Sequence, residues 1–590
     1  MYYSRGNYEA FAKPYPSNQP MKKSAHIIGG GLSGLATAAF LIRDGKMDGS
    51  RITVYEELNI LGGACDGRND PDRGFIIRGG REMESHYECL WDLFKSIPSL
   101  INKDNSILDD FYQINKFDPN ISLCRSIQKQ GSEPADDGKL HLNKKALKQL
   151  TKLICTTEDH LEDVKINDVW DKNIFDSTFW MYWRTMFAFE EWHSALELRR
   201  YILRFIHDFH GMHDFSVVKF SKYNQYESFI QPIIKYLEKQ GVKFILDATV
   251  NNVKFQITDE AKTAKVIEAT IGGKKKTINL TKDDLVFITN GSCTQNSSLG
   301  SYSTLDVLNT KPGSIWEMWK NIAKQSPDFG NPDVYCTNIE ATKWESATAI
   351  IRSPKIMSYI EKICKRPVIN PEHKGASGGI VTVRDSNWLM SFSCNRQPHF
   401  QLQPNDTAEV WIYGLFPNKP GDYIKKPMQA CTGKEIVQEW MYHIGVPTNQ
   451  IEALSDKKNV NVVPCMMPYI TAFFMPRKNS DRPRVVPNKA VNFAFIGEFA
   501  ETERDCIFTI EYAARTAMEA VYQLLNVNRG IPEVYASCYD IRCLLRGTKV
   551  LLNGNTIQDS DLPWVGKKLI KRICKKNLVI NKILKDAKLI

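Results

Sequence analysis

The chain has 590 residues, of which 43% are hydrophobic and 11% aromatic, so it is not a disordered protein and two or three folded domains are predicted. Its fourteen cysteines form no CxxC pair and no histidine cluster has metal-ligand spacing, which argues against a metal site and favours a reducing compartment. Of the formal net charge of +10, residues 541–590 carry +9, because they hold twelve lysines and arginines against three aspartates. Such a basic tail predicts an anionic partner, and since no nucleic-acid-binding motif is present, we expect a membrane surface and no nucleic acid.

The start of the chain predicts a cytoplasmic protein. Residues 1–22 are polar and proline-rich, so we expect an N-terminal tail and no signal peptide. The most apolar early run, residues 27–42, is broken by four glycines and is shorter than the roughly 20 residues of a membrane span.

Residues 25–43, AHIIGGGLSGLATAAFLIR, predict a short strand, a glycine turn and a helix. Gly29, Gly31 and Gly34 fit G-x-G-x-x-G, in which the first glycine permits the tight turn. The second lets a pyrophosphate approach the backbone, and the third lets the helix pack on the strand. The unpaired N–H groups at the start of the helix would face the phosphates. The pattern predicts a dinucleotide site.

A second strand, RITVYEE at 51–57, ends in Glu56, which is placed to accept the ribose hydroxyls, and Gly62 and Gly63 follow. The E-x5-GG arrangement resembles the FAD-binding half of amine-oxidase-like flavoproteins more than the NAD half of dehydrogenases. We therefore expect an α/β protein with a Rossmann-like FAD-binding domain. The alternative is a doubly wound sheet that binds no cofactor.

Three later stretches are expected to return to this site. Residues 241–255 and 283–292 are predicted strands, and residues 490–525 predict a strand, a Gly-Glu turn and a long helix. The expected cofactor-binding residues are Gly29, Gly31, Gly34, Glu56, Gly62, Gly63, Arg78, Arg81, Val250, Asn290, Gly291, Gly497, Glu498 and Asp505.

The domain organisation follows from these pieces. A discontinuous FAD-binding domain is predicted from residues 23–88, 236–300 and 485–526. An inserted α+β substrate domain is expected at 89–235 and 301–484, followed by a basic helical extension at 527–590.

The segment RGGREMESHYECLWDLFKSIPSL at 78–100 begins with a charged, glycine-jointed turn just beyond the second glycine pair. Together with RRYILRFIHDF (199–209), KYNQYESFIQPI (222–233), SFSCNRQPHF (391–400) and GEFAETERDC (497–506), it resembles the oleate hydratases. These FAD-containing fatty acid hydratases are also called the myosin-cross-reactive-antigen family. The resemblance runs along essentially the whole chain.

The resemblance implies that water is added across the cis-9 double bond of a long-chain unsaturated fatty acid, so that oleate gives 10-hydroxystearate. It implies Glu82 as the base that holds the water and Tyr201 as the acid. It places Gln225, Ser393 and Asn395 at the fatty acid and its carboxylate, although family members often have threonine at the position of Ser393. Hydration is redox-neutral, so FAD would have a structural and electrostatic role. A homodimer is also implied.

Several alternatives stay open at this point. A tyrosine of ordinary pKa, about 10, is a poor acid for an alkene. Either its surroundings lower that pKa, or a protonated water near Glu82 supplies the proton while Tyr201 polarises the bond. Read without the resemblance, Tyr201 is a core-edge tyrosine. The aromatic stretch at 177–198 would line the substrate pocket or only pack the core. The alternative functions are a flavin-dependent lipid oxidoreductase or double-bond isomerase, and a lipid-binding protein.

The tail at 563–590 predicts a basic amphipathic helix that lies on a bilayer without spanning it. The alternative is a terminal helix that docks on its own protein or on a dimer partner. The apolar stripe comprises Leu569, Ile570, Ile573, Cys574, Ile580, Ile583, Leu584 and Ala587, with Trp564 at its entrance.

Overall fold

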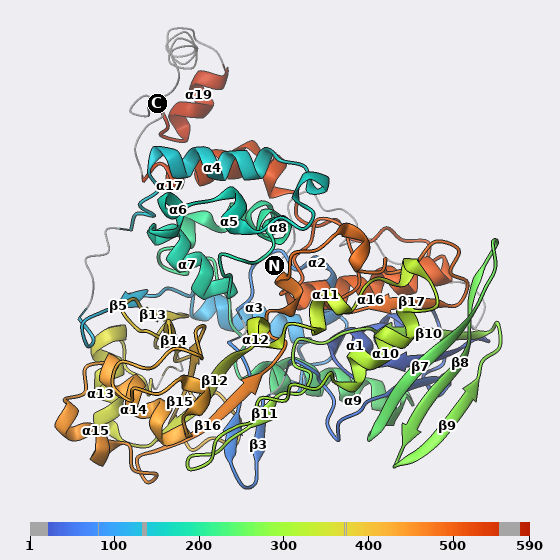
Figure 1. The fold of residues 1–590 in the computed structure, drawn as a ribbon, viewed down its shortest axis with the longest axis horizontal. Helices are drawn as coiled ribbons and strands as arrows, with labels where there is room; N and C mark the ends of the chain where they lie inside the picture. Colours follow the sequence, from blue (N-terminus) through green and yellow to red (C-terminus); the bar gives the residue numbers. More distant parts are fainter. Residues whose placement is uncertain are drawn as a thin grey trace.

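The computed structural model describes residues 22–65, 67–80, 82–132, 138–370, 372, 374–553 and 579–590 (Figure 1). The predicted N-terminal tail, Arg81 and the first part of the predicted tail helix lie outside the described residues.

A parallel five-stranded sheet of order β17-β10-β1-β2-β6 forms the first half of the molecule. Its strands are β1 (Ser24–Ile28), β2 (Ile52–Tyr55), β6 (Lys243–Ile245), β10 (Asp284–Thr289) and β17 (Phe493–Ile496). All five come from the three separated segments predicted for the FAD-binding domain. Because helices cover parallel strands, β10 and β17 are almost continuously apolar and buried. The α/β fold class predicted from the sequence is therefore confirmed.

Helices α1 (Leu32–Arg43) and α16 (Ile510–Leu525) pack against each other beside this sheet. Gly34 sets how closely α1 approaches β1, because a Cβ at this position would lie 2.0 Å from the carbonyl oxygen of Gly29. The third glycine of the motif thus serves helix–strand packing, as predicted.

The continuous strand predicted for residues 241–255 is wrong. The chain pairs with β2 only as β6, turns at Asp247, whose φ is +51°, and continues as β7 (Ala248–Ile257). β7 belongs to a separate antiparallel sheet with β8 (Lys262–Ile271) and β9 (Lys274–Asn279), at one edge of the molecule in Figure 1. Apolar periodicity alone gave no sign of this change of sheet.

A seven-stranded sheet of order β11-β16-β12-β15-β14-β13-β5 forms the second half, and every neighbouring pair except β13–β5 is antiparallel. Its strands are β5 (Ser126–Ile127), β11 (Ser298–Leu299), β12 (Trp344–Ile351), β13 (Val381–Val383), β14 (Met390–Ser393), β15 (Ala408–Gly414) and β16 (Val460–Met467). Helices α13 (Pro354–Cys364), α14 (Gly433–His443) and α15 (Thr448–Leu454) share a hydrophobic core with it.

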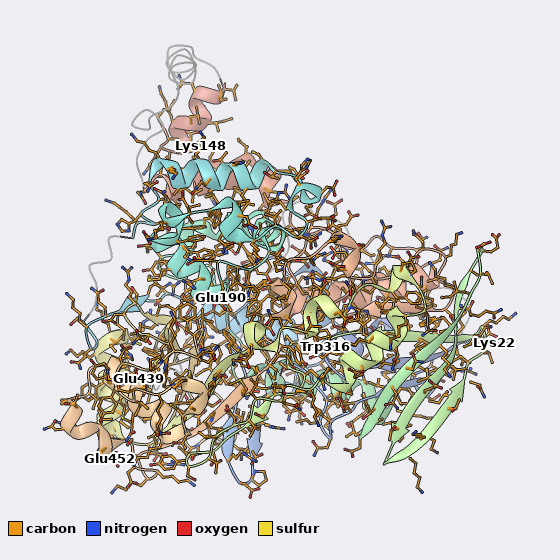
Figure 2. The ribbon with its side chains drawn as sticks, in the orientation of Figure 1. Lys22, Lys148, Glu190, Trp316, Glu439 and Glu452 are labelled. Carbon is orange, nitrogen blue, oxygen red and sulfur yellow. The ribbon has the colours of Figure 1, made fainter. Side chains whose placement is uncertain are left out.

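A helical layer lies above the seven-stranded sheet in Figure 1 and contains α4 (Lys144–Cys155), α7 (Thr178–Phe187) and α8 (Ala195–Phe205). The 3-10 helix η4 (Ile206–Gly211) continues α8 and packs against α17 (Ile541–Leu551). Figure 2 shows the packed interior around the fully buried Trp316. The remaining α-helices and the β3–β4 hairpin are α2 (Glu88–Phe94), α3 (Ile107–Phe117), α5 (Ile166–Val169), α6 (Lys172–Phe175), α9 (Gln231–Lys239), α10 (Ser314–Ala323), α11 (Asp333–Cys336), α12 (Ile339–Thr342), α19 (Val579–Asp586), β3 (Arg68–Asp70) and β4 (Gly74–Ile76). Among the described residues, no helix is both long enough and apolar enough to cross a bilayer.

Candidate active site

The glycine turn after β1 leaves room for a ligand at one position. Gly29 has a φ of +99°, which favours glycine, whereas Gly31 has an ordinary φ of −72°. A Cβ on Gly31 would meet only Gly63, whose Cα would lie 3.6 Å away. Protein packing therefore does not require glycine at position 31. The open backbone at the start of α1 fits the close approach of a pyrophosphate.

Glu56 stands at the end of β2 and reaches across to the same turn. Its carboxylate accepts hydrogen bonds from the N–H groups of Gly30, at 2.7 Å, and Leu58, at 2.9 Å. Burial raises its pKa, while these two hydrogen bonds oppose the increase. The side chain is thus held beside the glycine turn, where its carboxylate can also accept hydrogen bonds from the hydroxyl groups of a ribose.

The later segments bring polar groups to the ends of β10 and β17. The amide nitrogen of Asn290 donates to the carbonyl of Phe499 at 3.0 Å, and its buried Oδ1 has no partner among the described residues. Gly497 has a φ of +91°, and Glu498 accepts from the N–H of Cys293 at 3.1 Å. An unpartnered buried oxygen indicates a missing ligand or water at this edge.

Three other predicted cofactor residues are more enclosed. Val250 is buried in β7, and a Cβ on Gly291 would lie 2.5 Å from an aromatic ring carbon. Asp505 accepts from the guanidinium groups of Arg204 and Arg515, at 3.2 Å in each case. These two ion pairs account for the burial of the Asp505 carboxylate without a cofactor. Contact between Asp505 and a cofactor stays a prediction.

The turn that follows β4 connects the glycine turns at residues 29–34 and 62–63, together called the glycine cradle, to the segment of Lys219. The guanidinium of Arg78 donates to the carbonyl of Gly63 at 2.5 Å, so this arginine is not an ordinary surface charge. Further along, Met83 and Lys219 exchange backbone hydrogen bonds of 3.1 and 2.8 Å. Glu82 lies between these two anchors, so its position depends on both halves of the molecule.

A cavity of about 80 Å³ lies at Glu82. Its wall is mostly apolar and aromatic. Trp183, Met186 and Phe187 contribute from α7, whereas Trp180 and Tyr182 of the same helix are buried in the surrounding core. The aromatic stretch 177–198 thus divides between the wall of this cavity and the core, and its contact with substrate stays a prediction. Burial raises the pKa of Glu82 to about 7, although the positive charge of Arg125 opposes the increase. A carboxyl group with this pKa exchanges protons easily near neutral pH.

Tyr201 stands behind the cavity wall. Its fully buried ring packs against Phe187 and Phe205, two wall residues, at centroid distances of 5.2 and 6.1 Å. Its hydroxyl oxygen accepts a hydrogen bond of 3.0 Å from the N–H of Phe508, which also lines the cavity. Burial raises the pKa of Tyr201 well above its usual value. The alternative in which the surroundings lower this pKa is therefore wrong.

The three predicted substrate-binding residues lie outside the lining of this cavity but are buried. Neither the amide oxygen nor the amide nitrogen of Gln225 has a partner among the described residues, and the same holds for the hydroxyl of Ser393. Asn395 is 8% exposed. The segment of Gln225 is joined to residues 391–400, because the N–H of Asn224 donates to the carbonyl of His399 at 2.9 Å. Unpartnered buried polar groups cost free energy, which fits a place where a ligand binds.

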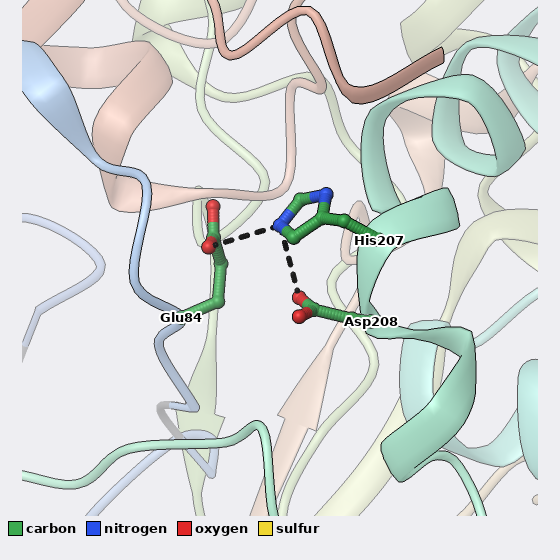
Figure 3. Close-up of side chains that lie close together, drawn as sticks. All are labelled: Glu84, His207 and Asp208. Carbon is green, nitrogen blue, oxygen red and sulfur yellow. Dashed lines mark hydrogen bonds and ion pairs between the residues drawn. The ribbon is translucent and has the colours of Figure 1, made fainter. Parts of the chain in front are cut away.

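Sequence reasoning missed a cluster beside Glu82, formed by Glu84, His207 and Asp208 (Figure 3). The Nε2 atom of His207 lies 3.4 Å from a carboxylate oxygen of Glu84 and 3.4 Å from one of Asp208. Glu84 and Asp208 also line the cavity. Both of the segments that meet here carry the family resemblance, but their separation in the sequence concealed the contact. The guanidinium of Arg204, 2.9 Å from Glu84, opposes binding of a metal cation here.

Comparisons with known proteins agree with the pattern of the sequence. The profile of the MCRA family matches residues 22–522. The chain is 49% identical over 594 residues to an oleate hydratase of Streptococcus pyogenes serotype M49, and the match covers all of both chains. It is 34% identical over 540 residues to a linoleate hydratase of Lactiplantibacillus plantarum, covering 86% of this chain and 94% of the other. Among solved structures, a cyclohexylamine oxidase of Brevibacterium oxydans IH-35A is similar with a TM-score of 0.49 and 12% identity, covering 85% of this chain and 99% of that chain.

Proposed function

The chain belongs to the MCRA family, and from this premise we propose that it is a fatty acid hydratase, a hydro-lyase. It adds water across the cis-9 double bond of a long-chain unsaturated fatty acid, so that oleate gives 10-hydroxystearate. Similarity to an oleate hydratase and a linoleate hydratase supports this activity. The structural observation that carries the proposal is the carboxyl group of Glu82, with a pKa of about 7, at an apolar cavity.

Hydration of an isolated alkene delivers a proton to one carbon and the oxygen of water to the other. Positive charge develops on the substrate in the transition state, and a nearby carboxylate stabilises it. Ionised Glu82 orients the water, accepts its proton as the C–O bond forms, and lowers the energy of the developing cation. Each turnover consumes one proton at the alkene and releases one to Glu82, so no net proton or electron is used.

The source of the first proton follows from the surroundings of Tyr201. Because its pKa is raised, Tyr201 stays protonated and is a poorer acid than in water. We therefore do not adopt Tyr201 as the acid. The second alternative assigns the proton to a protonated water near Glu82, and we propose more broadly that a protonated group of the cavity supplies it. Tyr201 polarises the site through its hydroxyl and holds Phe508 at the cavity wall.

The substrate requires more space than this cavity offers. Ligand sites are commonly about 300–1,000 Å³, so the 80 Å³ cavity must widen when a long acyl chain enters. Its aromatic wall suits the alkene region of the chain. Gln225, Ser393 and Asn395 are proposed to hold the fatty acid and its carboxylate, since Gln225 and Ser393 offer buried polar atoms with no partner in the described part of the chain.

FAD is the proposed cofactor, and the residues of the glycine cradle fit it. Gly31 leaves the backbone open to a pyrophosphate, Glu56 is placed for the ribose, and Asn290 has an unpartnered oxygen. When bound, the flavin would supply electrostatic support to the site and no electrons to the product. The hydrogen bond from Arg78 to the carbonyl of Gly63 links the glycine cradle to the turn that carries Glu82. A cofactor that orders the cradle would therefore also order this turn.

We also propose that the protein is a cytoplasmic homodimer and that it binds peripherally to an anionic membrane. In the described part of the predicted tail helix, Ile580 and Ile583 are 47% and 36% exposed, while Leu584 is buried. The predicted apolar stripe is therefore divided, with part of it available to a bilayer and part packed on protein. A fatty acid partitions into membranes, so an enzyme that uses it gains by binding there.

The proposed activity is tested by incubating purified protein, FAD and oleate under anaerobic conditions, with and without an added electron acceptor. We expect a product heavier than oleate by one water and a yield that does not depend on the acceptor. A product formed only with stoichiometric reduction of the acceptor would identify a lipid oxidoreductase. A product with the mass of oleate and a shifted double bond would identify an isomerase.

A further inference from the structure

The cavity at Glu82 contains more ionisable groups than a base alone requires. Glu84 and Asp208 line the same 80 Å³ space, although most of its wall is apolar. A buried carboxylate is costly unless it is paired or has a function. Glu84 is paired with Arg204 at 2.9 Å, whereas Asp208 forms an ion pair only with His207 among the described residues. The role of the Asp208–His207 pair is therefore the question that the geometry raises.

His207 stands between the cavity and a much larger groove. On one side its Nε2 atom is 3.4 Å from the carboxylates of Glu84 and Asp208 (Figure 3). On the other side its Nδ1 atom is 3.0 Å from the hydroxyl of Ser537. The ring of His207 also packs edge-on against Tyr535, at a centroid distance of 5.0 Å, and Tyr535 and Cys538 line a groove of about 1,050 Å³ that also reaches Arg204. His207 lines neither space and Ser537 is fully buried, so this ring and hydroxyl lie between the carboxylates of the small cavity and the wall of the groove.

We propose that Asp208 is the acid that protonates the alkene, and that His207 is a positioning residue that reloads Asp208 with a proton from the groove. This inference rests on the proposed hydratase function. The Asp208 proton passes to one alkene carbon while water oxygen bonds to the other and Glu82 accepts the proton that water loses. The Nε2 proton of His207 then restores Asp208, and its Nδ1 accepts a proton through Ser537. Glu82 returns its proton to water as the alcohol leaves, and loss of the Nδ1 proton of His207 with uptake of one at Nε2 restores its starting tautomer, so the cycle has no net proton change.

The electrostatics of the cluster suit these roles. Burial raises the pKa of Asp208, and the nearby negative charge of Glu84 adds to the increase while His207 opposes it. Although burial opposes it, the carboxylates of Asp208 and Glu84 raise the pKa of His207. Arg204 and His207 hold the pKa of Glu84 far below its usual range in spite of its burial. The surroundings thus favour the protonated form of Asp208 and the ionised form of Glu84.

The groups that face this pair come from every neighbouring element. Glu84 lies on the turn after β4, and Lys219 is on the segment that pairs with that turn. The charged and titratable groups around His207 and Asp208 are Glu84, His86, Arg204, His210 and Lys219, with Tyr535 stacked on His86.

A purely structural role would produce a different signature. If the pair only supported the fold, its removal would lower stability and activity together, and added small molecules would not restore turnover. A proton relay instead predicts a change in the pH profile and chemical rescue. His213 and Asp214 provide a matched control, because they form a similar pair, 3.4 Å apart, and His213 is substantially exposed.

The experiment uses the full-length chain reconstituted with FAD and measures oleate hydration between pH 5 and 9. We expect Asp208→Asn to reduce kcat by at least about 100-fold, to leave oleate binding within a few-fold of the parent, and to abolish the loss of activity at high pH. We expect His207→Ala to lose activity that millimolar imidazole restores, while His213→Ala stays active and does not respond.

The inference is overturned if Asp208→Asn retains activity within threefold with an unchanged pH profile. It is also overturned if imidazole fails to restore His207→Ala that is folded and binds oleate. Should Asp208→Asn fail to fold, the rescue of His207→Ala decides alone. If the parent protein hydrates oleate, either result removes only the proposed roles of Asp208 and His207 and leaves the hydratase function standing. A parent protein that does not hydrate oleate would remove the proposed function itself.

Discussion

At the scale of single residues, burial explains the behaviour of Glu82. Its folded-state pKa is about 7, above the ordinary value of 4.5, so the folded chain holds this proton more tightly than the unfolded chain. Ionised Glu82 therefore destabilises the folded state by an amount that grows from about pH 4.5 and is complete above about pH 7. The difference corresponds to about 3 kcal/mol at most.

Glu82→Gln should accordingly be more stable than the parent at pH 8, with a Tm higher by a few degrees. The advantage should largely disappear at pH 5, where the folded parent is protonated. Thermal unfolding of both proteins at the two pH values checks this expectation. An equal difference in Tm at pH 5 and pH 8 would mean that the carboxyl group of Glu82 is not the buried, weakly acidic group described here.

Tyr201→Phe tests the second residue of the predicted pair. The change conserves the ring and its packing but removes the acceptor of the Phe508 N–H, which should cost about 1–3 kcal/mol of stability. We expect kcat to fall at least tenfold with neither limb of the pH profile shifted between pH 5 and 9, because the pKa of Tyr201 lies above that range. A variant that loses one limb of the profile would instead identify Tyr201 as the titrating acid.

Sequence reasoning reached these two residues through family resemblance and could not reach their surroundings. It left open which way the pKa of Tyr201 moves, because burial is a property of the packed core. It missed Asp208 and His207, although both lie in the segment 199–209 that carries the resemblance, since Glu84 contacts His207 only in the folded chain. Gln225 and Ser393 could be named from the sequence, but their unpartnered polar atoms appear only in the structure.

At the scale of elements, the strand–turn–helix at the start of the chain offers a pair of contrasting substitutions. Gly31 has an ordinary backbone conformation and open space around a Cβ, whereas a Cβ on Gly34 would lie 2.0 Å from a backbone oxygen. Gly31→Val should therefore fold, lose FAD and lose activity. Gly34→Ala should lose stability as well.

Flavin absorbance after purification, together with the Tm of the FAD-free protein, distinguishes the two variants. A folded Gly31→Val that binds no FAD but still hydrates oleate would contradict the ordering role of the cofactor. The sequence predicted this element well, because the glycine spacing reports directly on close backbone approach. It predicted the strand at 241–255 poorly, because the turn at Asp247 that moves the chain into another sheet leaves no periodic signal.

At the scale of the whole molecule, the α/β class and the three segments that supply the parallel sheet were predictable, since each strand carries its own apolar signal. The order of seven strands in the other sheet was not, because it depends on pairings far apart in the sequence. For the tail helix, the sequence likewise predicted which face is apolar but not what that face packs against. Leu584 and Leu589 are buried, while Ile580 and Ile583 are exposed.

The exposed pair allows membrane binding to be tested without disturbing the packed side of the helix. Ile580→Asp combined with Ile583→Asp should weaken sedimentation with phosphatidylglycerol vesicles, and deletion of residues 563–590 should abolish it. Binding by the parent should weaken with salt, since each basic residue near the surface contributes roughly 1 kcal/mol that salt screens. Val307→Asp, at another exposed apolar position, serves as the control and should bind as the parent does. Undiminished binding by the truncated protein would make the tail a structural or dimerisation element.

The central claim is that Glu82 directs a molecule of solvent water onto the double bond of a fatty acid. The most direct measurement is oleate hydration in heavy-oxygen water by the FAD-loaded parent and by Glu82→Gln, with the product analysed by mass spectrometry. We predict hydroxystearate in which the new hydroxyl carries the heavy oxygen, and a rate lower by about 10²–10⁴-fold for Glu82→Gln. Unlabelled product, or a Glu82→Gln variant that forms labelled product as fast as the parent, would contradict the account.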